Sequence, residues 1–350
     1  MSREDEIVAL LAAHHGLPGA VVERVPLGTE TDNYQATSVG LRFFVKAYRP
    51  GTDLTETAAG LEASDFARRG GCPIPALRPG RHGSLLTAAG GLAVSVWDWI
   101  EAAPATGPLA PAEGAQIGVM LARLHQRLAA YPHPGRFRPT SEPWWCRDTA
   151  PVHDLGRRIL AAIDALPTPT KADLLHHERV RQRLEDLRFV PALQAGLPPD
   201  LPMQLVHCDV TRPNLLFAAG GDLAAVVDLR GRVLHPAWEV GRIAYDPLTV
   251  ATSSNWRTFA NSVVAAYAEH APPAALAQLH FSARLTLLQA LQTWFGLADT
   301  YLQPTTGADP DGIRYWNNRY EMSRELLQHL PTIEDELTDL LGPVTTRPTN

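Results

Sequence analysis

Short runs of alternating hydrophobic and polar residues fill the first hundred positions, and they are separated by Gly-containing or Asp-Asn turns. This spacing predicts antiparallel strands joined as hairpins, at 21–28, 33–39, 41–48 and 84–100. Gly90–Gly91 supplies the turn of the last hairpin. Residues 4–15 and 55–69 carry apolar side chains at helical spacing instead. We therefore expect a small antiparallel sheet with one helix inserted between its strands.

Beyond a linker rich in Pro, Ala and Gly at 101–111, the spacing of apolar residues becomes helical. Helices are predicted at 112–130, 152–164, 170–188, 255–270, 273–300 and 311–342. Segment 203–228 departs from this pattern, with three extended stretches separated by a loop and by a turn at Gly220–Gly221. The expected fold class is α+β, with a small N-terminal lobe at 1–100 and a larger, mostly helical C-terminal lobe at 101–350.

The composition limits the classes of partner. The 350 residues are 45% hydrophobic and 19% charged, which is typical of a soluble globular protein long enough for two lobes. A formal net charge of −6 is not the basic excess of a nucleic-acid-binding protein. Three widely spaced cysteines predict reduced thiols rather than disulfides or a zinc site. Because the sequence has no signal-peptide pattern and no apolar run of about 18 residues, we expect a cytoplasmic protein without a membrane partner.

Lysine is rare in this chain. Lys46 and Lys171 are its two lysines, and every other basic residue among the 31 is arginine. Lys46 lies inside an apolar strand, FFVKAY at 43–48. Where arginine is the usual cation, a lysine in such a strand becomes a candidate site residue; the alternative is a solvent-facing lysine on an edge strand.

Two polar segments carry the candidate chemistry, HCDVTRPN at 207–214 and AAVVDLRG at 224–231. Pro213 keeps the first segment from forming a regular helix, and the Gly-Gly turn is expected to fold Asp228 back beside Asp209 and Asn214. Two carboxylates and one amide oxygen suit Mg²⁺, whose other ligands are often substrate phosphates. The remaining carboxylate can accept a proton from an attacking hydroxyl group. The alternative is a tight turn with satisfied polar groups.

These segments resemble the H-x-D-x-x-x-x-N loop and the following metal-binding Asp of kinase-like phosphotransferases. They are most similar to those of the aminoglycoside phosphotransferase and choline kinase family. The strand FFVKAY and the segment IGVMLARLHQRL at 117–128 resemble two further motifs of that family, in the same order along the chain. The resemblance covers about residues 20–300 and implies a bilobal, protein-kinase-like fold.

The resemblance implies a role for each matching residue around the second pair of motifs. Asp209 would be the catalytic base or would orient the acceptor hydroxyl group. Asn214 and Asp228 would bind Mg²⁺. His207 would have a structural role, bracing the loop through a hydrogen bond.

On the N-terminal side, the resemblance implies a site for ATP or GTP. Lys46 would contact the α- and β-phosphates, and Glu62, or alternatively Glu56, would hold Lys46. The turn 28–33 would lie over the phosphates. Further nucleotide contacts are implied for Asn33 in that turn and for Trp97, Trp99 and Ile100 in a hinge at 96–102 that binds adenine.

The chain departs from the family pattern at several positions. The turn at 28–31 has one glycine instead of G-x-G-x-x-G, and Cys208 replaces the commoner Gly. Asp228 is followed by Leu229–Arg230, and Arg230 either competes with Mg²⁺ or points outward. Arg212 either faces the γ-phosphate or lies on the surface. The candidate substrate residues are Glu239, Asp246 and Trp294.

The resulting hypothesis is an ATP- or GTP-dependent O-phosphotransferase that acts on a hydroxyl group of a small molecule, as a monomer or homodimer. An antibiotic acceptor is favoured, although no acidic cluster demands a polycationic aminoglycoside. A metabolite kinase acting on homoserine, choline or a sugar is the second candidate. A catalytically inactive nucleotide-binding regulator is a third, and the presence of Lys46, Asp209, Asn214 and Asp228 argues against it.

Overall fold

The computed structural model describes residues 2–26, 31–137, 144–303 and 310–342. Contacts within the chain divide it into two compact units. The first unit comprises Met1–Ala105, Arg123–Arg138 and Gln204–Val233, and the second comprises Thr106–Ala122, Pro139–Met203 and Leu234–Asn350. The boundaries of these units differ from those of the expected lobes, because Arg123–Arg138 and Gln204–Val233 belong to the first unit. The division into lobes at 1–100 and 101–350 stays a prediction.

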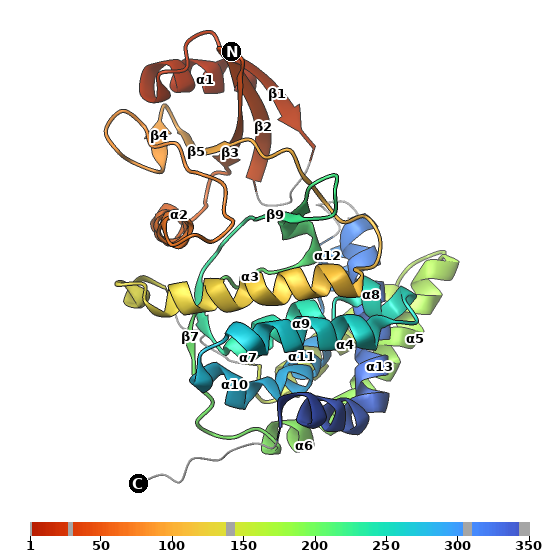
Figure 1. The fold of residues 1–350 in the computed structure, drawn as a ribbon. Coiled ribbons are helices and arrows are strands. Elements are labelled where there is room, and N and C mark those ends of the chain that lie inside the picture. Colours follow the sequence, from red (N-terminus) through yellow and green to blue (C-terminus); the bar gives the residue numbers. More distant parts are fainter. Residues whose placement is uncertain (1, 27–30, 138–143, 304–309, 343–350) are drawn as a thin grey trace. The chain divides into compact units, whose positions relative to one another are not determined.

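The first unit contains a five-stranded antiparallel sheet with the strand order β1-β2-β3-β5-β4 (Figure 1). Its strands are β1 (Val21–Val25), β2 (Thr31–Ser38), β3 (Leu41–Tyr48), β4 (Thr87–Ala89) and β5 (Leu92–Asp98). The hairpins expected from the hydrophobic pattern are confirmed, including the turn at Gly90–Gly91 between β4 and β5.

One face of this sheet packs against the N-terminal helix α1 (Arg3–Leu10) and a π-helical turn, Leu11–His15. Alternate residues of the central strands point into the core, among them Val45 of β3 and Val94 of β5, which are fully buried against Ile7. Because side chains alternate across a strand, the residues between them lie on the opposite face. That second face carries Lys46.

Helix α2 (Leu54–Arg69) is the helix inserted between β3 and β4. Asp53 caps its N-terminus, since its side chain accepts hydrogen bonds from the backbone N–H groups of Thr55 (3.0 Å) and Glu56 (3.1 Å). A Cβ atom on Gly60 would lie 3.1 Å from the carbonyl oxygen of Leu229. The glycine therefore allows α2 to approach the backbone that follows Asp228.

The remaining strands of the first unit are short. They are β6 (Ala103–Pro104), β7 (Gln204–Val206), β8 (Leu215–Phe217), β9 (Leu223–Val226) and β10 (Arg232–Leu234). Strands β6, β8 and β9 form one sheet, and β7 pairs with β10. The extended, loop and turn pattern predicted for 203–228 is confirmed. The short strands β6 and β10 were not predicted.

The second unit is helical, and its first helix, α3 (Pro111–Ala129), continues into the first unit. Its other helices are α4 (Ala150–Asp164), α5 (Lys171–Asp186), α6 (Val190–Ala195), α7 (Pro236–Ala244), α8 (Pro247–Thr252), α9 (Trp256–His270), α10 (Pro273–Leu279), α11 (Ser282–Leu291), α12 (Leu297–Leu302) and α13 (Pro310–Leu341). Short 3₁₀ turns occur at Pro134–Arg136, Leu187–Phe189 and Arg212–Asn214. The predicted α+β class is confirmed.

The prediction of one continuous helix at 273–300 was wrong, because the segment forms α10, α11 and α12. The break between α11 and α12 ends at Gly296, which has a positive φ of 71°. A Cβ atom there would lie 2.7 Å from the carbonyl oxygen of Gly312, so α13 approaches this turn closely. Helices α7 and α8 were also not predicted. Within the described ranges, none of the helices has the length and apolar character needed to cross a membrane.

Candidate active site

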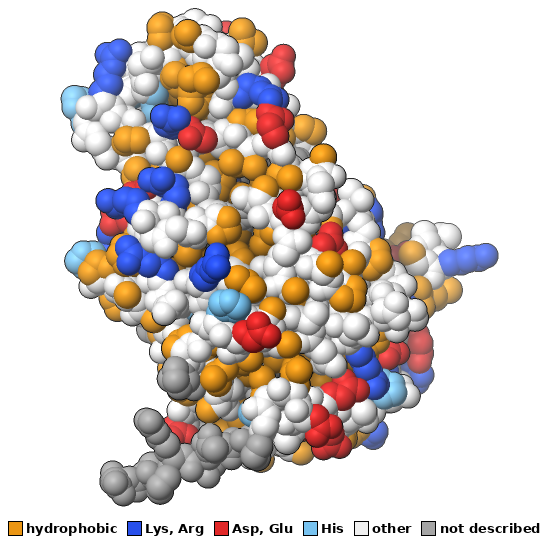
Figure 2. All heavy atoms as spheres, viewed as in Figure 1, with side chains coloured by type: hydrophobic (Ala, Val, Ile, Leu, Met, Phe, Trp, Pro, Cys, Tyr) orange, Lys and Arg blue, Asp and Glu red, His pale blue; other side chains and the backbone are white. Residues whose placement is uncertain are grey.

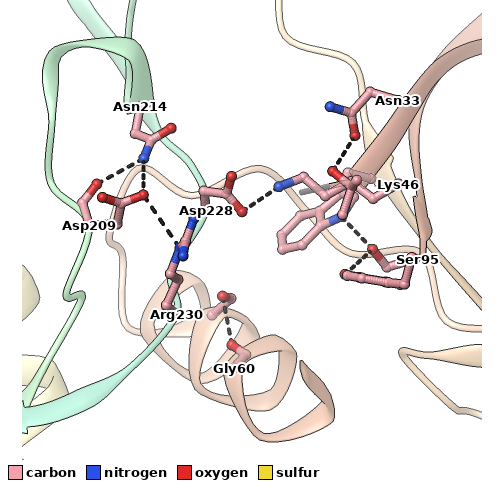
Figure 3. Close-up of polar contacts among 12 residues, drawn as sticks. Asn33, Lys46, Gly60, Ser95, Asp209, Asn214, Asp228 and Arg230 are labelled. Carbon is pink, nitrogen blue, oxygen red and sulfur yellow. Dashed lines mark hydrogen bonds and ion pairs between the residues drawn. The ribbon is translucent and has the colours of Figure 1, made fainter. Parts of the chain in front are cut away.

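A row of polar residues crosses the sheet on the face opposite the core. Lys46 of β3 pairs in register with Asn33 of β2 on one side and with Ser95 of β5 on the other. Directly opposed residues of neighbouring strands project to the same face, so the three side chains lie together (Figure 3). The structure thus brings together Lys46 and Asn33, two of the residues expected at the nucleotide phosphates.

Hydrogen bonds fix this row. The Thr31 hydroxyl group donates to Asn33 Oδ1 at 2.9 Å. Ser95 Oγ accepts a hydrogen bond from the indole N–H of Trp97 at 3.0 Å, and it lies 2.9 Å from the Tyr48 hydroxyl oxygen. Burial raises the pKa of Tyr48 to about 12, so this phenol stays neutral at physiological pH. The sequence analysis did not identify Ser95 and Tyr48 as site residues. The available signal for Tyr48 was its position two residues after Lys46 on the same strand, and that for Ser95 was its pairing with Lys46 across two strands.

The loop after β7 places Asp209. His207 is fully buried, and its Nδ1 atom accepts a hydrogen bond from the backbone N–H of Asp209 at 3.2 Å. Cys208 between them has a positive φ of 74°. This is the left-handed conformation that glycine adopts most readily, which is a physical reason for the Gly that is commoner here in the family that the sequence resembles. The hydrogen bond supports the bracing role expected for His207.

Asn214 holds the Asp209 carboxylate in place. Its Nδ2 group donates to the Asp209 backbone carbonyl at 2.8 Å and to Asp209 Oδ2 at 3.0 Å. Because the amide N–H groups face Asp209, the Asn214 Oδ1 atom points away from that carboxylate (Figure 3). The amide oxygen is therefore directed so that it can serve as a ligand.

Backbone hydrogen bonds bring Asp228 beside this loop. The N–H of Val227 donates to the carbonyl of Asn214 at 2.9 Å, before Asp228. After it, the N–H groups of Arg230 and Gly231 both donate to the carbonyl of His207 at 3.1 Å. The expectation that the β8–β9 hairpin returns Asp228 to the Asp209 loop is confirmed.

Asp228 forms an ion pair with Lys46, with 2.5 Å between Oδ1 and Nζ (Figure 3). The Lys46 side chain is 12% exposed and that of Asp228 is 45% exposed. Burial opposes ionisation of Asp228, but the Lys46 ammonium group overcomes this effect. With smaller contributions from Arg230 and His207, it holds the pKa of Asp228 below its ordinary value. The carboxylate is ionised and can bind a cation at neutral pH.

The partner expected for Lys46 is different in the structure. Glu62 forms an ion pair with Arg136, and Glu56 forms one with Arg232. Lys46 is paired with Asp228 instead of either glutamate. The physical reason is that both glutamates on α2 have guanidinium partners, which bind a carboxylate through several donors.

Arg212 is part of the Asp209 loop, and Arg230 contacts the Asp209 side chain. Arg212 Nη1 donates to the carbonyl of Ala105 at 2.5 Å, which ties the loop to the segment after β6. Arg230 Nε lies 3.5 Å from Asp209 Oδ2. Its guanidinium group faces the expected base (Figure 3), and its side chain is 44% exposed, so competition of Arg230 with Mg²⁺ stays a prediction. A γ-phosphate contact by Arg212 stays a prediction.

The segment expected to bind adenine, 96–102, comprises the last residues of β5 and the residues that follow the strand. Trp97 is buried with its indole N–H on Ser95. Trp99 lies beside Phe44, with ring centroids 6.3 Å apart, and the Arg42 guanidinium carbon is 5.5 Å from its ring centroid. Both tryptophans pack against neighbours of the sheet, while an adenine contact by this segment, including Ile100, stays a prediction. Of the turn 28–33, residues 28–30 lie outside the described residues.

The three candidate substrate residues lie in the second unit. Glu239 is fully buried in the first turn of α7. Asp246 caps α8, because its carboxylate accepts hydrogen bonds from the backbone N–H (2.9 Å) and the hydroxyl group (2.8 Å) of Thr249. This arrangement favours a structural role for Asp246. Trp294 is buried and lines a cavity of about 350 Å³.

The donor set fits Mg²⁺. Asn214 Oδ1 and the Asp228 carboxylate are hard oxygen ligands, and two such protein ligands suffice when phosphate oxygens complete the octahedron. Within the described ranges, His, Cys, Asp and Glu nowhere form a group of three or more that could hold a metal ion. A metal at Asn214 and Asp228 would therefore depend on the nucleotide for its other ligands.

Comparison with known proteins gives one family match. Residues 21–281 match the sequence model of a family described as the phosphotransferase enzyme family. The comparison with curated proteins finds no match.

Several solved structures are similar to this chain over most of its length. A spectinomycin phosphotransferase in complex with ADP and spectinomycin is 16% identical, with a TM-score of 0.70 over 93% of this chain and 99% of that chain. A microcompartment-associated aminopropanol kinase is also 16% identical, with a TM-score of 0.59 over 95% and 100%. A choline kinase from Streptococcus pneumoniae is 16% identical, with a TM-score of 0.53 over 93% and 99%. At these identities the likeness shows a shared fold.

Proposed function

Because the chain belongs to the phosphotransferase enzyme family over residues 21–281, we propose that it transfers the γ-phosphoryl group of ATP or GTP to a hydroxyl group of a small molecule. The observation that carries this proposal is the geometry of one site. Lys46, Asp209, Asn214 and Asp228 all lie within the first unit, linked by the hydrogen bonds and ion pairs described above. A regulator that only bound nucleotide would not need Asp209 in this place.

The nucleotide is proposed to bind on the sheet face that carries Lys46. Mg²⁺, held by Asn214 and Asp228, would supply the positive charge that phosphoryl transfer requires. Lys46 is the second positive charge on this face, and Asn33 and Ser95 on either side of it offer hydrogen-bonding groups to phosphate oxygens. This arrangement of neutral and cationic groups suits a polyanionic ligand.

Asp209 is proposed to accept the proton of the acceptor hydroxyl group. As that proton leaves, the acceptor oxygen forms a bond to the γ-phosphorus and the bond to the β-phosphate oxygen breaks, releasing the nucleoside diphosphate. Asn214 fixes the position of the Asp209 carboxylate, and Arg230 lies on its other side. Most of the rate enhancement would then come from positioning and from neutralised charge.

The proposed acceptor is an alcohol that also carries an amine, with an antibiotic as the first candidate. The names of the three similar structures support this choice, because spectinomycin, aminopropanol and choline each combine a hydroxyl group with a nitrogen cation. The TM-score is 0.70 for the antibiotic enzyme and 0.53 for the choline kinase. A metabolite kinase is the second candidate function.

We propose that the enzyme acts in the cytoplasm, as a monomer or homodimer, without a nucleic-acid partner. On the face drawn in Figure 2, acidic and basic side chains are both present, with hydrophobic ones between them. Together with the net charge of −6, this supports small-molecule partners over a nucleic acid.

The test is nucleotide consumption measured with ATP and GTP against a panel of hydroxylated antibiotics and amino alcohols. Asp209→Asn should lower kcat by about 10²–10⁴-fold, since a neutral amide cannot accept the hydroxyl proton. Asp222→Asn, in the exposed turn between β8 and β9, removes the same charge outside the site and should keep wild-type activity. The proposal fails if no acceptor on the panel stimulates turnover, or if Asp209→Asn is as active as the wild type.

A further inference from the structure

Arg230 is one of the positions at which the chain departs from the family pattern, and it lies two residues after Asp228. Its backbone is held between two segments of the first unit. The Arg230 N–H donates to the His207 carbonyl at 3.1 Å, and a Cβ atom on Gly60 of α2 would lie 3.5 Å from the Arg230 carbonyl oxygen. The Asp209 loop and α2 therefore fix the point from which the Arg230 side chain extends.

That side chain extends toward the expected base (Figure 3). Arg230 Nε lies 3.5 Å from Asp209 Oδ2, the oxygen atom that also accepts the 3.0 Å hydrogen bond from Asn214. This separation exceeds the roughly 2.7–3.2 Å of a normal N–H···O hydrogen bond, and the Arg230 side chain is 44% exposed. Because solvent weakens such a pair, the guanidinium group can turn to another anion at little cost in free energy.

The charges around Arg230 are balanced before a nucleotide binds. Asp209 and Asp228 supply two carboxylates, and Lys46 and Arg230 supply two cations. The charge of Arg230 acts on both carboxylates, since it also helps to hold the pKa of Asp228 below its ordinary value. A nucleoside triphosphate brings more negative charge than one Mg²⁺ neutralises, so phosphoryl transfer requires further cations at the phosphate oxygens.

The γ-phosphoryl group must come close to Arg230 if Asp209 accepts the proton of the acceptor. The attacking oxygen then lies within about 3 Å of the Asp209 carboxylate and about 3.5 Å of the phosphorus atom. A guanidinium group carries five N–H donors at the end of a flexible side chain. A rotation of the Arg230 side chain therefore suffices to bring donors from Asp209 to the γ-phosphate oxygens.

We propose that Arg230 is a catalytic residue of this chain: its guanidinium group turns from Asp209 to the γ-phosphoryl oxygens when the triphosphate binds and stabilises the charge of the transferring group. This inference rests on the proposed function and adds a residue to it. Arg230 stays protonated throughout, and the bonds that form and break are those of the transfer described above. Its departure also leaves the Asp209 carboxylate open to the acceptor hydroxyl group.

Calorimetry on the full chain with Mg²⁺ tests this without an acceptor. The probes are ADP and the non-hydrolysable analogue adenylyl imidodiphosphate, which carries the γ-phosphate that ADP lacks, and their guanine equivalents. Arg230→Met should weaken binding of the triphosphate analogue by about tenfold, because a charged hydrogen bond is lost, and should leave binding of the diphosphate within about twofold of the wild type. Arg230→Lys keeps the charge and should recover part of the loss.

Arg68→Met is the matched control, because it removes a partly exposed guanidinium group that pairs with Asp65 on α2, away from the proposed site. It should bind both nucleotides like the wild type. The assignment is wrong if Arg230→Met weakens both nucleotides equally, as a structural role predicts, or if it changes neither. It is also wrong if this variant binds the triphosphate analogue more tightly, as competition between Arg230 and Mg²⁺ predicts.

These outcomes separate the inference from the proposed function. In each of them the wild type still binds nucleotide, so phosphoryl transfer stands and the role of Arg230 alone is lost. If the wild type binds none of the nucleotides, the proposed nucleotide site and the role of Arg230 are both wrong.

Discussion

At the scale of single residues, Cys208 holds a backbone conformation that its side chain disfavours. Its φ of 74° is left-handed, which costs a residue with a Cβ atom about 1 kcal/mol relative to glycine. Because His207 and Asp209 on either side are joined by a hydrogen bond, the loop geometry requires this φ value. Cys208→Gly should therefore raise the free energy of unfolding by about 1 kcal/mol with activity retained.

Urea denaturation of the two proteins measures this change. Cys208→Ala keeps a Cβ atom and serves as the control, because it removes the thiol without relieving the backbone. Equal stability of the Gly and Ala variants would show that the left-handed conformation is not strained at this position.

Lys46 is the second residue whose environment supports a prediction. It lies in the row between Asn33 and Ser95 and pairs with Asp228. Lys46→Met should lower kcat/KM for ATP by about 10²-fold, because a fixed positive charge beside the phosphates is lost. The free energy of unfolding should change by less than about 1 kcal/mol, because solvent screens the half-exposed Asp228 partner.

Lys171→Met is the matched control, since Lys171 is the other lysine of the chain and begins α5 in the second unit. Steady-state kinetics with ATP as the varied substrate measures both variants. If Lys46→Met keeps its KM and kcat, the nucleotide does not bind on this face of the sheet.

At the scale of elements, the turn between β2 and β3 has an unfavourable residue. Val39 and Gly40 have φ values of 50° and 75°, which is the pattern of a type I′ turn. A β-branched residue rarely adopts a positive φ, and Asn is among the residues preferred at this position. Val39 is 91% exposed, so its replacement removes little packing. Val39→Asn should raise the free energy of unfolding by about 1 kcal/mol.

Thermal and urea denaturation measure the effect of this turn. Val39→Thr keeps the β-branch while making the side chain polar, so it should not be stabilising. If both variants gain the same stability, the cause is the lost surface hydrophobicity and not the backbone of the turn.

The elements also show what the sequence could predict. Strands β1–β5 and the β8–β9 hairpin were predictable because alternation and Gly-Gly turns are local signals. The end of α11 was not, since the turn before α12 is determined by the close approach of Gly296 to Gly312, which lies on α13. The Lys46–Asp228 pair joins residues far apart in sequence, and helical spacing along α2 could not show that Glu62 and Glu56 would pair with arginines.

At the scale of the whole molecule, buried and half-buried histidines couple stability to pH. Four histidines have a pKa below the ordinary value of 6.5, and burial is the largest cause at each of them. They are His15, His176, His235 and His280. A histidine with a lowered folded-state pKa binds fewer protons in the native than in the unfolded chain just below pH 6.5. Its stabilising contribution is present above that pH and is lost as the pH falls toward the folded-state value.

The unfolding free energy should therefore decrease between pH 8 and pH 5.5, with a slope of up to about 1.4 kcal/mol per pH unit for each histidine that titrates. Urea denaturation at several pH values in this window measures the slope. His280→Gln should make it shallower, because burial alone lowers the pKa of His280 and glutamine takes up no proton. His82→Gln, at an exposed position, should leave the slope unchanged. A stability that is flat from pH 8 to pH 5.5 would contradict the prediction, because it would mean that these histidines have the same pKa in the folded and the unfolded chain.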